Sequence, residues 1–415
     1  MDTVRERSSL APSTQAIVAV ACAITVANNY YAQPLLAAIG RDLHASAPAL
    51  GAIAASTQFG YALGILALVP LGDTIDPRRL VLILLGVVFV AQILCSIAPN
   101  ATALGITSFA LGFATVVPQI LIPYVASLAD AGARGRVIGI TQSGQIVGIL
   151  GARVVAGALE PLIGWRTIFL VAAAGTAVLA IAVALRLQRR TSSVTSASYG
   201  ELLCSLPTFL RTYPALREAC ALGALTFVAF SAFWTTIALF LSAHPLPFAL
   251  AHGAPPSVVV GALALVGIAS ALAAPAIGRL ADRRGPLVGN GVALALCALG
   301  FLALLFADVP PLMAAAILVG VVLLDVGGQG NQVSNQARIL ALGKGVGSRV
   351  NTIYMTTRFL SGALGSVLAA NAWDAYGWHG VCALGLFSIA AALVVYGIAL
   401  RRARDTVVFQ TPSAP

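Results

Sequence analysis

The stretch LVLILLGVVFVAQILCSIAPNATALGITSFALGFATVVPQILIPYVASLA, residues 80–129, contains no Asp, Glu, Lys or Arg. A helix needs about 20 mainly apolar residues to cross a bilayer, so the stretch is long enough for two helices with a turn at Pro99-Asn100. Its apolar residues follow one another continuously, whereas a barrel strand would alternate apolar and polar residues over about 10 residues. The stretch therefore predicts a pair of transmembrane helices.

The rest of the chain has the same character. Of its 415 residues, 59% are hydrophobic and only 9% are charged, whereas a soluble domain has about 25% charged residues. We therefore predict an all-α membrane protein. The twelve predicted transmembrane helices cover residues 15–39, 48–71, 79–98, 101–128, 136–159, 165–187, 218–243, 256–280, 286–307, 310–338, 348–371 and 378–400.

The basic residues lie on one side of this predicted arrangement. Of the 24 Lys and Arg residues, 20 fall at the termini or in one set of loops, while the opposite loops hold only Arg41 and Arg166. Because cytoplasmic loops are enriched in basic residues, both termini are predicted to be cytoplasmic. The net charge of +10 thus reflects topology and not nucleic-acid binding. We expect a multi-pass protein of a bacterial inner membrane, in contact with the lipid bilayer.

Two sequence motifs in the first half of the chain recur in the second half. Val69-Pro-Leu-Gly-Asp73 aligns with Gly278-Arg-Leu-Ala-Asp282, and Gly164-Trp165-Arg166 recurs as Gly377-Trp378-His379. Similar offsets at two landmarks indicate a duplicated six-helix unit. The predicted parts are a first six-helix half over 1–187, a cytoplasmic linker over 188–217 and a second six-helix half over 218–415.

The loop Gly278-Arg-Leu-Ala-Asp282-Arg-Arg-Gly285 resembles the loop signature of the major facilitator superfamily, and the earlier loop is a partial copy of it. The resemblance covers essentially the whole chain and implies the superfamily's twelve-helix fold. Glycine permits a tight turn, and an aspartate at a helix end can pair with a helix N-terminus or an arginine. The resemblance therefore implies a cytoplasmic gate made by Asp73, Arg78, Arg79, Gly278, Asp282, Arg283 and Gly285.

Four further segments resemble one bacterial branch of small-molecule efflux proteins, the drug and metabolite exporters that work as proton antiporters. They are Asn29–Leu36, Val117–Pro123, Gly148–Arg153 and Gln332–Arg338. The resemblance implies a secondary active transporter that works by alternating access and exports a small metabolite or drug-like molecule in a proton-coupled reaction.

Three ionisable residues lie well inside the predicted helices: Arg153, Asp325 and Arg358. Each costs about 2.5–3.5 kcal/mol at the centre of a helix, so such residues are functional candidates. A proton-driven transporter needs a group that takes up and releases protons. We predict that Asp325 and Arg358 form a pair that couples transport to protons; a permanent structural pair is the alternative.

Polar side chains also recur at spacings that place them on one helix face. The resemblance places four helices around a central cavity, and these polar faces would form its walls, although hydrogen bonds between helices are the alternative for each residue. The predicted substrate cavity comprises Asn29, Tyr30, Tyr31, Gln33, Gln119, Gln142, Gln145, Arg153, Trp234, Gln329, Gln332 and Tyr354. Close helix packing is expected at Gly60, Gly64, Gly144, Gly148 and Gly151.

Other classes of function lack sequence support. The chain has no Walker A loop, no HExxH, no CxxC pair and no Gly-x-Ser-x-Gly, so we expect neither an enzyme nor a cofactor or metal. The predicted partners are a small-molecule substrate and protons, and we expect a monomer. Two alternatives to the proton-coupled exporter are an organic-anion uniporter or exchanger, suggested by two buried arginines against one aspartate, and a membrane receptor that does not transport.

The predicted topology can be tested by cysteine-accessibility labelling in a background without native cysteines. A cysteine at Ser196 should be protected from an impermeant reagent added to the periplasmic side, whereas one at Ala249 should react. Labelling of position 196 from the periplasm would contradict the topology.

Overall fold

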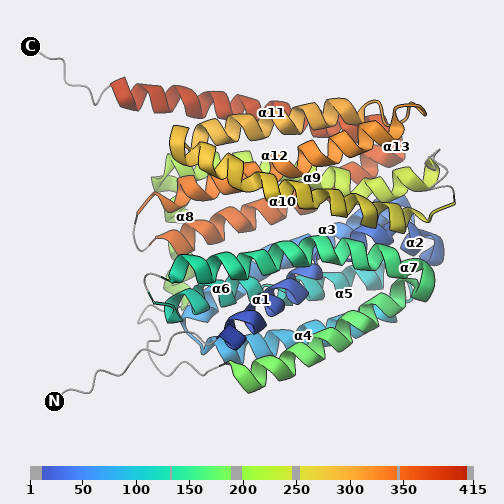
Figure 1. Cartoon of the computed structure of the whole chain (residues 1–415), viewed down its shortest axis with the longest axis horizontal. Helices are drawn as coiled ribbons and strands as arrows, with labels where there is room; N and C mark the ends of the chain where they lie inside the picture. Colours follow the sequence, from blue (N-terminus) through green and yellow to red (C-terminus); the bar gives the residue numbers. More distant parts are fainter. Residues whose placement is uncertain (1–11, 131–132, 188–198, 245–252, 344–345, 409–415) are drawn as a thin grey trace, which may run out of the picture.

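The computed structural model describes residues 12–130, 133–187, 199–244, 253–343 and 346–408, and in these ranges every regular element is helical (Figure 1). The elements are α1 (Pro12–Ala27), α2 (Ala32–Leu43), α3 (Ala47–Leu68), η1 (Pro70–Asp73), α4 (Pro77–Ser96), α5 (Ala101–Ala114), α6 (Val117–Leu128), α7 (Arg134–Arg186), α8 (Tyr199–Thr212), α9 (Pro214–Ala243), α10 (Pro256–Arg284), α11 (Pro286–Leu304), α12 (Met313–Leu340) and α13 (Gly347–Val408).

Eight helices in the described ranges are long and apolar enough to cross a membrane. Two of them, α7 and α13, each cover two of the predicted spans. Helical geometry is interrupted at Gly164 (φ 75°) in α7 and at Gly377 (φ 59°) in α13, and in Figure 1 each helix changes direction along its length. Glycine adopts a positive φ at little cost, so two helices meet at each of these glycines, which lie between the predicted spans 136–159 and 165–187 and between 348–371 and 378–400.

Two other predicted spans are broken in the middle. The span 15–39 becomes α1 and α2, which are joined through Asn28–Tyr31. The span 101–128 becomes α5 and α6, and Pro118 at the start of α6 lacks the N–H that would continue the helix. The first break contains Asn29, Tyr30 and Tyr31 of the predicted cavity, and the second lies just before Gln119 of that set.

The helices form two groups (Figure 1). Helices α1–α7 lie in the lower part of the view and α9–α13 in the upper part; we call these the first half (12–187) and the second half (214–408). The predicted linker contains α8, whose Tyr199 hydroxyl donates to the carbonyl of Ala67 at 2.8 Å, while residues 188–198 lie outside the described part.

The halves meet through glycines. A Cβ atom at Gly51 of α3 would collide with Ala370 of α13, and one at Gly157 of α7 would collide with the backbone of Ser257 in α10. The Ser257 hydroxyl also donates to Glu160 at 2.8 Å. All of these contacts lie toward the end of the molecule where Gly164 and Gly377 turn the chain, which we call the distal end.

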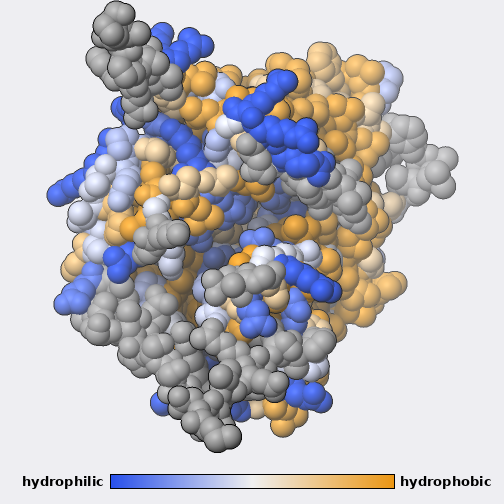
Figure 2. All heavy atoms as spheres, turned by 60° about the vertical axis from the view of Figure 1, so that its left-hand side comes forward, coloured by the Kyte–Doolittle hydropathy of each residue, from blue (hydrophilic) through white to orange (hydrophobic). Residues whose placement is uncertain are grey.

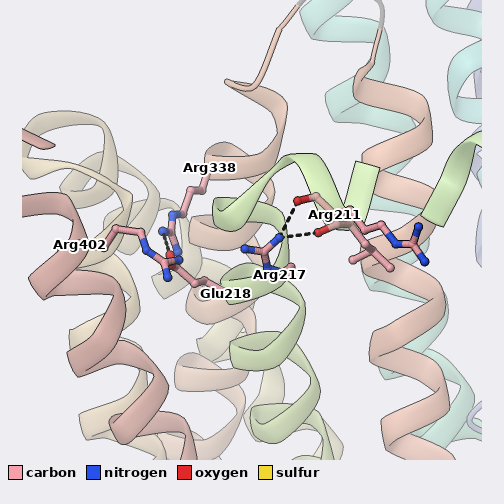
Figure 3. A network of polar contacts seen from close by, with 6 residues as sticks. Arg211, Arg217, Glu218, Arg338 and Arg402 are labelled. Atoms are coloured by element: carbon pink, nitrogen blue, oxygen red, sulfur yellow. Dashed lines mark hydrogen bonds and ion pairs between the residues drawn. The ribbon is translucent and has the colours of Figure 1, made fainter. Parts of the chain in front are cut away.

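The opposite end, which holds α8 and the last turn of α13, we call the terminal end. Figure 2 shows this end hollowed between the halves, with hydrophilic residues around and inside the hollow and hydrophobic residues on the flanks. At its rim Glu218 of α9 pairs with Arg338 of α12 and Arg402 of α13 (Figure 3). Arg217 donates to the carbonyls of Leu210 and Arg211 and so ties α8 to α9. The halves therefore pack at the distal end and separate at the terminal end.

Within the first half, four of the five glycines predicted to allow close packing do so. A Cβ atom at Gly60, Gly64, Gly144 or Gly148 would collide with the backbone of a neighbouring helix. The prediction for Gly151 is wrong, because no described atom lies within 4 Å of the position its Cβ would take.

Replacing Gly148 with valine should destabilise the protein by about 1–3 kcal/mol, since the side chain would force α7 away from Ala23 of α1. Gly86→Val is the matched control, because Gly86 is also inside a helix and its Cβ would meet no described atom within 4 Å. Chemical unfolding in detergent micelles measures both. Equal losses of stability would show that helix propensity, and not close packing, dominates at Gly148.

Candidate substrate and coupling site

Arg153 of α7 is at the centre of the predicted site, with 1% of its surface exposed. Its Nε donates to Oε1 of Gln33 at 2.7 Å. Its Cζ lies 3.9 Å from the ring centre of Trp234 and 4.8 Å from that of Tyr30. Arginine is held this way because aromatic faces attract a guanidinium most strongly where water is excluded. Its Nη2 is buried and has no hydrogen-bond partner among the described residues.

Asp325 of α12 approaches the same indole from the second half. The Nε1 of Trp234 donates to Oδ1 of Asp325 at 3.3 Å, and the carboxylate abuts Gly267 of α10, where a Cβ would lie 2.8 Å from Oδ2. One tryptophan thus contacts a cation of the first half with its face and an anion of the second half with its edge.

The predicted pairing of Asp325 with Arg358 is wrong for this conformation. Within the described ranges no ion pair joins them, and the Cζ of Arg358 lies instead 4.0 Å from the ring centre of Phe227. Position along a helix does not fix the direction in which a side chain points around the helix axis. The structure makes Arg153 the cation next to Asp325.

A narrow pocket opens beside these charges between the two halves. The space between its atoms comes to about 220 Å³ when space open to solvent is counted, so the side chains leave little room in this conformation. It is lined by Asn29, Tyr30, Gln33, Gln58, Phe227, Phe230, Ser231 and Phe359. All of these except Phe230 are buried.

The other predicted cavity residues are less closely associated with this pocket. Gln119 donates to the hydroxyl of Tyr61 at 3.3 Å, and Tyr354 is buried against Gly223. The remaining members of the predicted set are half-buried or exposed and do not line the pocket: Tyr31, Gln142, Gln145, Gln329 and Gln332.

Sequence reasoning missed a group of hydrogen bonds that crosses between the halves. Gln58 of α3 donates to Ser366 at 3.0 Å and accepts from Ser231 at 3.2 Å. Thr235 donates to the same Ser366 hydroxyl at 2.9 Å. A glutamine in an apolar span is a detectable signal, and Gln58 could have been singled out like those of other helices. Its serine and threonine partners could not, because such residues commonly bond to their own helix backbone.

Comparison with known proteins agrees with this architecture. Residues 18–366 match the family model of the Major Facilitator Superfamily. The chain belongs to this superfamily. It is 37% identical to the putative uncharacterized transporter YgaY of Escherichia coli K12, over 93% of this chain and 95% of YgaY. It is 34% identical to the probable transporter SCO4007 of Streptomyces coelicolor, over 95% of this chain and 89% of that protein.

Solved superfamily structures share the fold. The nucleoside transporter NupG superposes with a TM-score of 0.74 at 14% identity, over 97% of this chain and 100% of that chain. A POT family transporter in complex with 5-aminolevulinic acid superposes with a TM-score of 0.76 at 12% identity, over 93% and 96% of the two chains. The protein is thus a multi-pass secondary transporter of the superfamily's type and not an enzyme.

The superfamily loop motif is described in part. Gly285 lies between α10 and α11 with a φ of 94°, a conformation that glycine adopts at little cost. Arg78 donates through Nη2 to the carbonyl of Ala184, and Arg79 and Arg283 are exposed. Gly278 lies in α10 near Val333 of α12. The side chains of Asp73 and Asp282 lie outside the described part, so the predicted aspartate latch stays a prediction.

A double-mutant cycle tests the contact of Trp234 with Asp325. Trp234→Phe keeps an aromatic face for Arg153 but removes the indole N–H, and should cost about 1.5–3 kcal/mol because the lost hydrogen bond is to a charged group. Combined with Asp325→Asn, it should show a coupling energy above about 0.5 kcal/mol in chemical unfolding.

The matched cycle pairs Asp325→Asn with Arg358→Gln and should show a coupling energy below about 0.5 kcal/mol. A larger coupling energy in this second cycle than in the first would support the predicted pairing of Asp325 with Arg358.

Proposed function

We propose that the protein is a proton-coupled exporter of a small molecule, working by alternating access with Asp325 as the proton-carrying group. The observation that supports this most is the position of Asp325, a buried carboxylate at the junction of the halves whose indole partner also contacts Arg153. A buried carboxylate in a membrane bundle is a candidate for a proton relay.

The distribution of these residues between the halves suggests how protons could be coupled to movement. Arg153 belongs to the first half, whereas Trp234 and Asp325 belong to the second. If the halves rock apart, the contact of Arg153 with Trp234 must break, and Asp325 loses its nearest cation. A carboxylate that gains and loses a cationic neighbour holds a proton differently in the two states. Arg358 remains in this proposal as a second cation, which lies over Phe227 and forms no ion pair with Asp325.

The conformation fits one stage of such a cycle. We propose that the chain crosses an inner membrane twelve times, with each arm of α7 and α13 counted as one span, and that the terminal end is cytoplasmic. The packed distal end would then be a closed outer gate and the hollow terminal end an opening to the cytoplasm. The loop motif at Asp73, Arg78 and Asp282 would act at the cytoplasmic gate, and one chain would form a complete transport unit.

Purified protein in liposomes tests this function. A thermal-shift screen with metabolites and antibiotics supplies a ligand, since a ligand stabilises the state that it binds. With that ligand on one side, the wild type should change the luminal pH as the ligand crosses. Asp325→Asn should bind the ligand with a similar affinity but lose the pH change, because an amide releases no proton. Asp374→Asn is the control, since Asp374 is an exposed carboxylate and should leave coupling unchanged.

Each outcome has a defined meaning for the proposal. Proton movement that persists in Asp325→Asn would remove Asp325 from the mechanism. Wild-type flux whose rate does not depend on the pH gradient would identify a uniporter or exchanger. No flux of any stabilising ligand would identify a receptor.

A further inference from the structure

We propose that the transported molecule is a small organic monoanion with an apolar body, whose anionic group binds Arg153. This inference rests on the proposed transport function and adds the class of substrate. Three observations lead to it: the charges at the pocket do not balance, both arginines keep an unpaired nitrogen, and the walls between them are aromatic.

The charge count at the centre of the molecule leaves one cation uncompensated. Arg153 and Arg358 are 1% and 5% exposed, and Asp325 is the one carboxylate that the structure places among them in its described part. Arg153 lies over the ring of Tyr30 and Arg358 over that of Phe227, and both rings line the pocket. An unpaired charge in a dry bundle is strongly unfavourable. A ligand with one negative charge would neutralise the site.

The arginines retain the hydrogen-bonding capacity to bind an anion. Nη2 of Arg153 and Nη1 of Arg358 are buried and have no hydrogen-bond partner among the described residues. A buried donor without a partner costs about 1–3 kcal/mol, and more when the group is charged. Gln33 lines the pocket and fixes Nε of Arg153 at 2.7 Å, which orients the guanidinium beside the pocket. Carboxylate is the geometric match for such a planar donor.

The rest of the ligand would meet aromatic rings. Phe227 and Phe230 stack with centroids 5.5 Å apart, and Phe359 meets Phe227 edge-on at 5.3 Å. Arg358 lies over Phe227 at 4.0 Å, and Arg153 lies 5.9 Å from the centre of Phe230. Because guanidinium groups already lie against these rings, a cationic ligand would be repelled. An apolar or aromatic body would lie against the rings that line the pocket.

Thermal unfolding of the purified full-length protein tests the class of ligand without any transport measurement. The probes are benzoate, phenylacetate and hexanoate, each beside its neutral amide, with benzylamine as the cation. At least one carboxylate should raise the melting temperature, while its amide and benzylamine should not. Arg153→Gln should abolish this preference, and Arg153→Lys should keep it with at least tenfold weaker binding because lysine lacks the planar fork. Arg404→Gln, at an exposed arginine near the end of α13, is the control and should behave as wild type.

Several results would overturn the inference. These are no shift with any carboxylate, an equal shift with an amide or with benzylamine, or a carboxylate preference that survives in Arg153→Gln. If Arg153→Gln does not fold, Gln33→Ala provides the same test through the loss of the bond that orients the guanidinium, and an unchanged carboxylate affinity would count against the proposal. If one of these results is obtained while proton-coupled flux is still observed in liposomes, the substrate class is wrong but the proposed transport function is not. The failure of this inference can therefore be distinguished from the failure of the proposed function.

Discussion

Burial of the Arg153 guanidinium in the middle of a bilayer-spanning bundle is the constraint on which the surrounding structure depends. A charge in that position is tolerated only with partners that replace water. Gln33 supplies a hydrogen bond, and Tyr30 and Trp234 supply aromatic faces. Since Trp234 belongs to the other half of the molecule, solvating this one charge also brings the halves together.

The same contact places the carboxylate of Asp325. The indole of Trp234 has only one polar atom to satisfy, and it donates that N–H to Asp325. The aromatic ring therefore separates the two charges and still allows them to attract each other through a medium that screens poorly. A direct ion pair across the halves would resist separation more strongly. An interposed ring is a weaker link, which suits the alternating access proposed for this protein.

Backbone atoms of the two halves approach each other closely near the distal end, and glycine explains where. Gly51 and Gly157 let α3 and α7 approach α13 and α10 until backbone atoms touch. In the membrane, where lipid is as apolar as a helix surface, such small-residue contacts are a main source of helix association. The polar bonds of Gln58 with Ser231 and Ser366 add specificity beside them. At the terminal end Glu218 pairs with Arg338 and Arg402, which belong to its own half.

Sequence alone determined the membrane class, the superfamily resemblance and the identity of the three buried charged residues. The length of an apolar segment, and the presence of an ionisable residue within it, can be read directly from the order of residues along the chain. It also identified Gly285 as a turn and Gly148 as a packing position, since glycine has few other uses there. The tertiary structure decided which side chains each of these charged residues contacts. Helical spacing gives depth and face within one helix, but the rotation of each helix against its neighbours depends on packing across the whole bundle. That rotation placed Asp325 against Trp234 and Arg153, turned Arg358 toward Phe227, and brought Gln58 to the boundary between the halves.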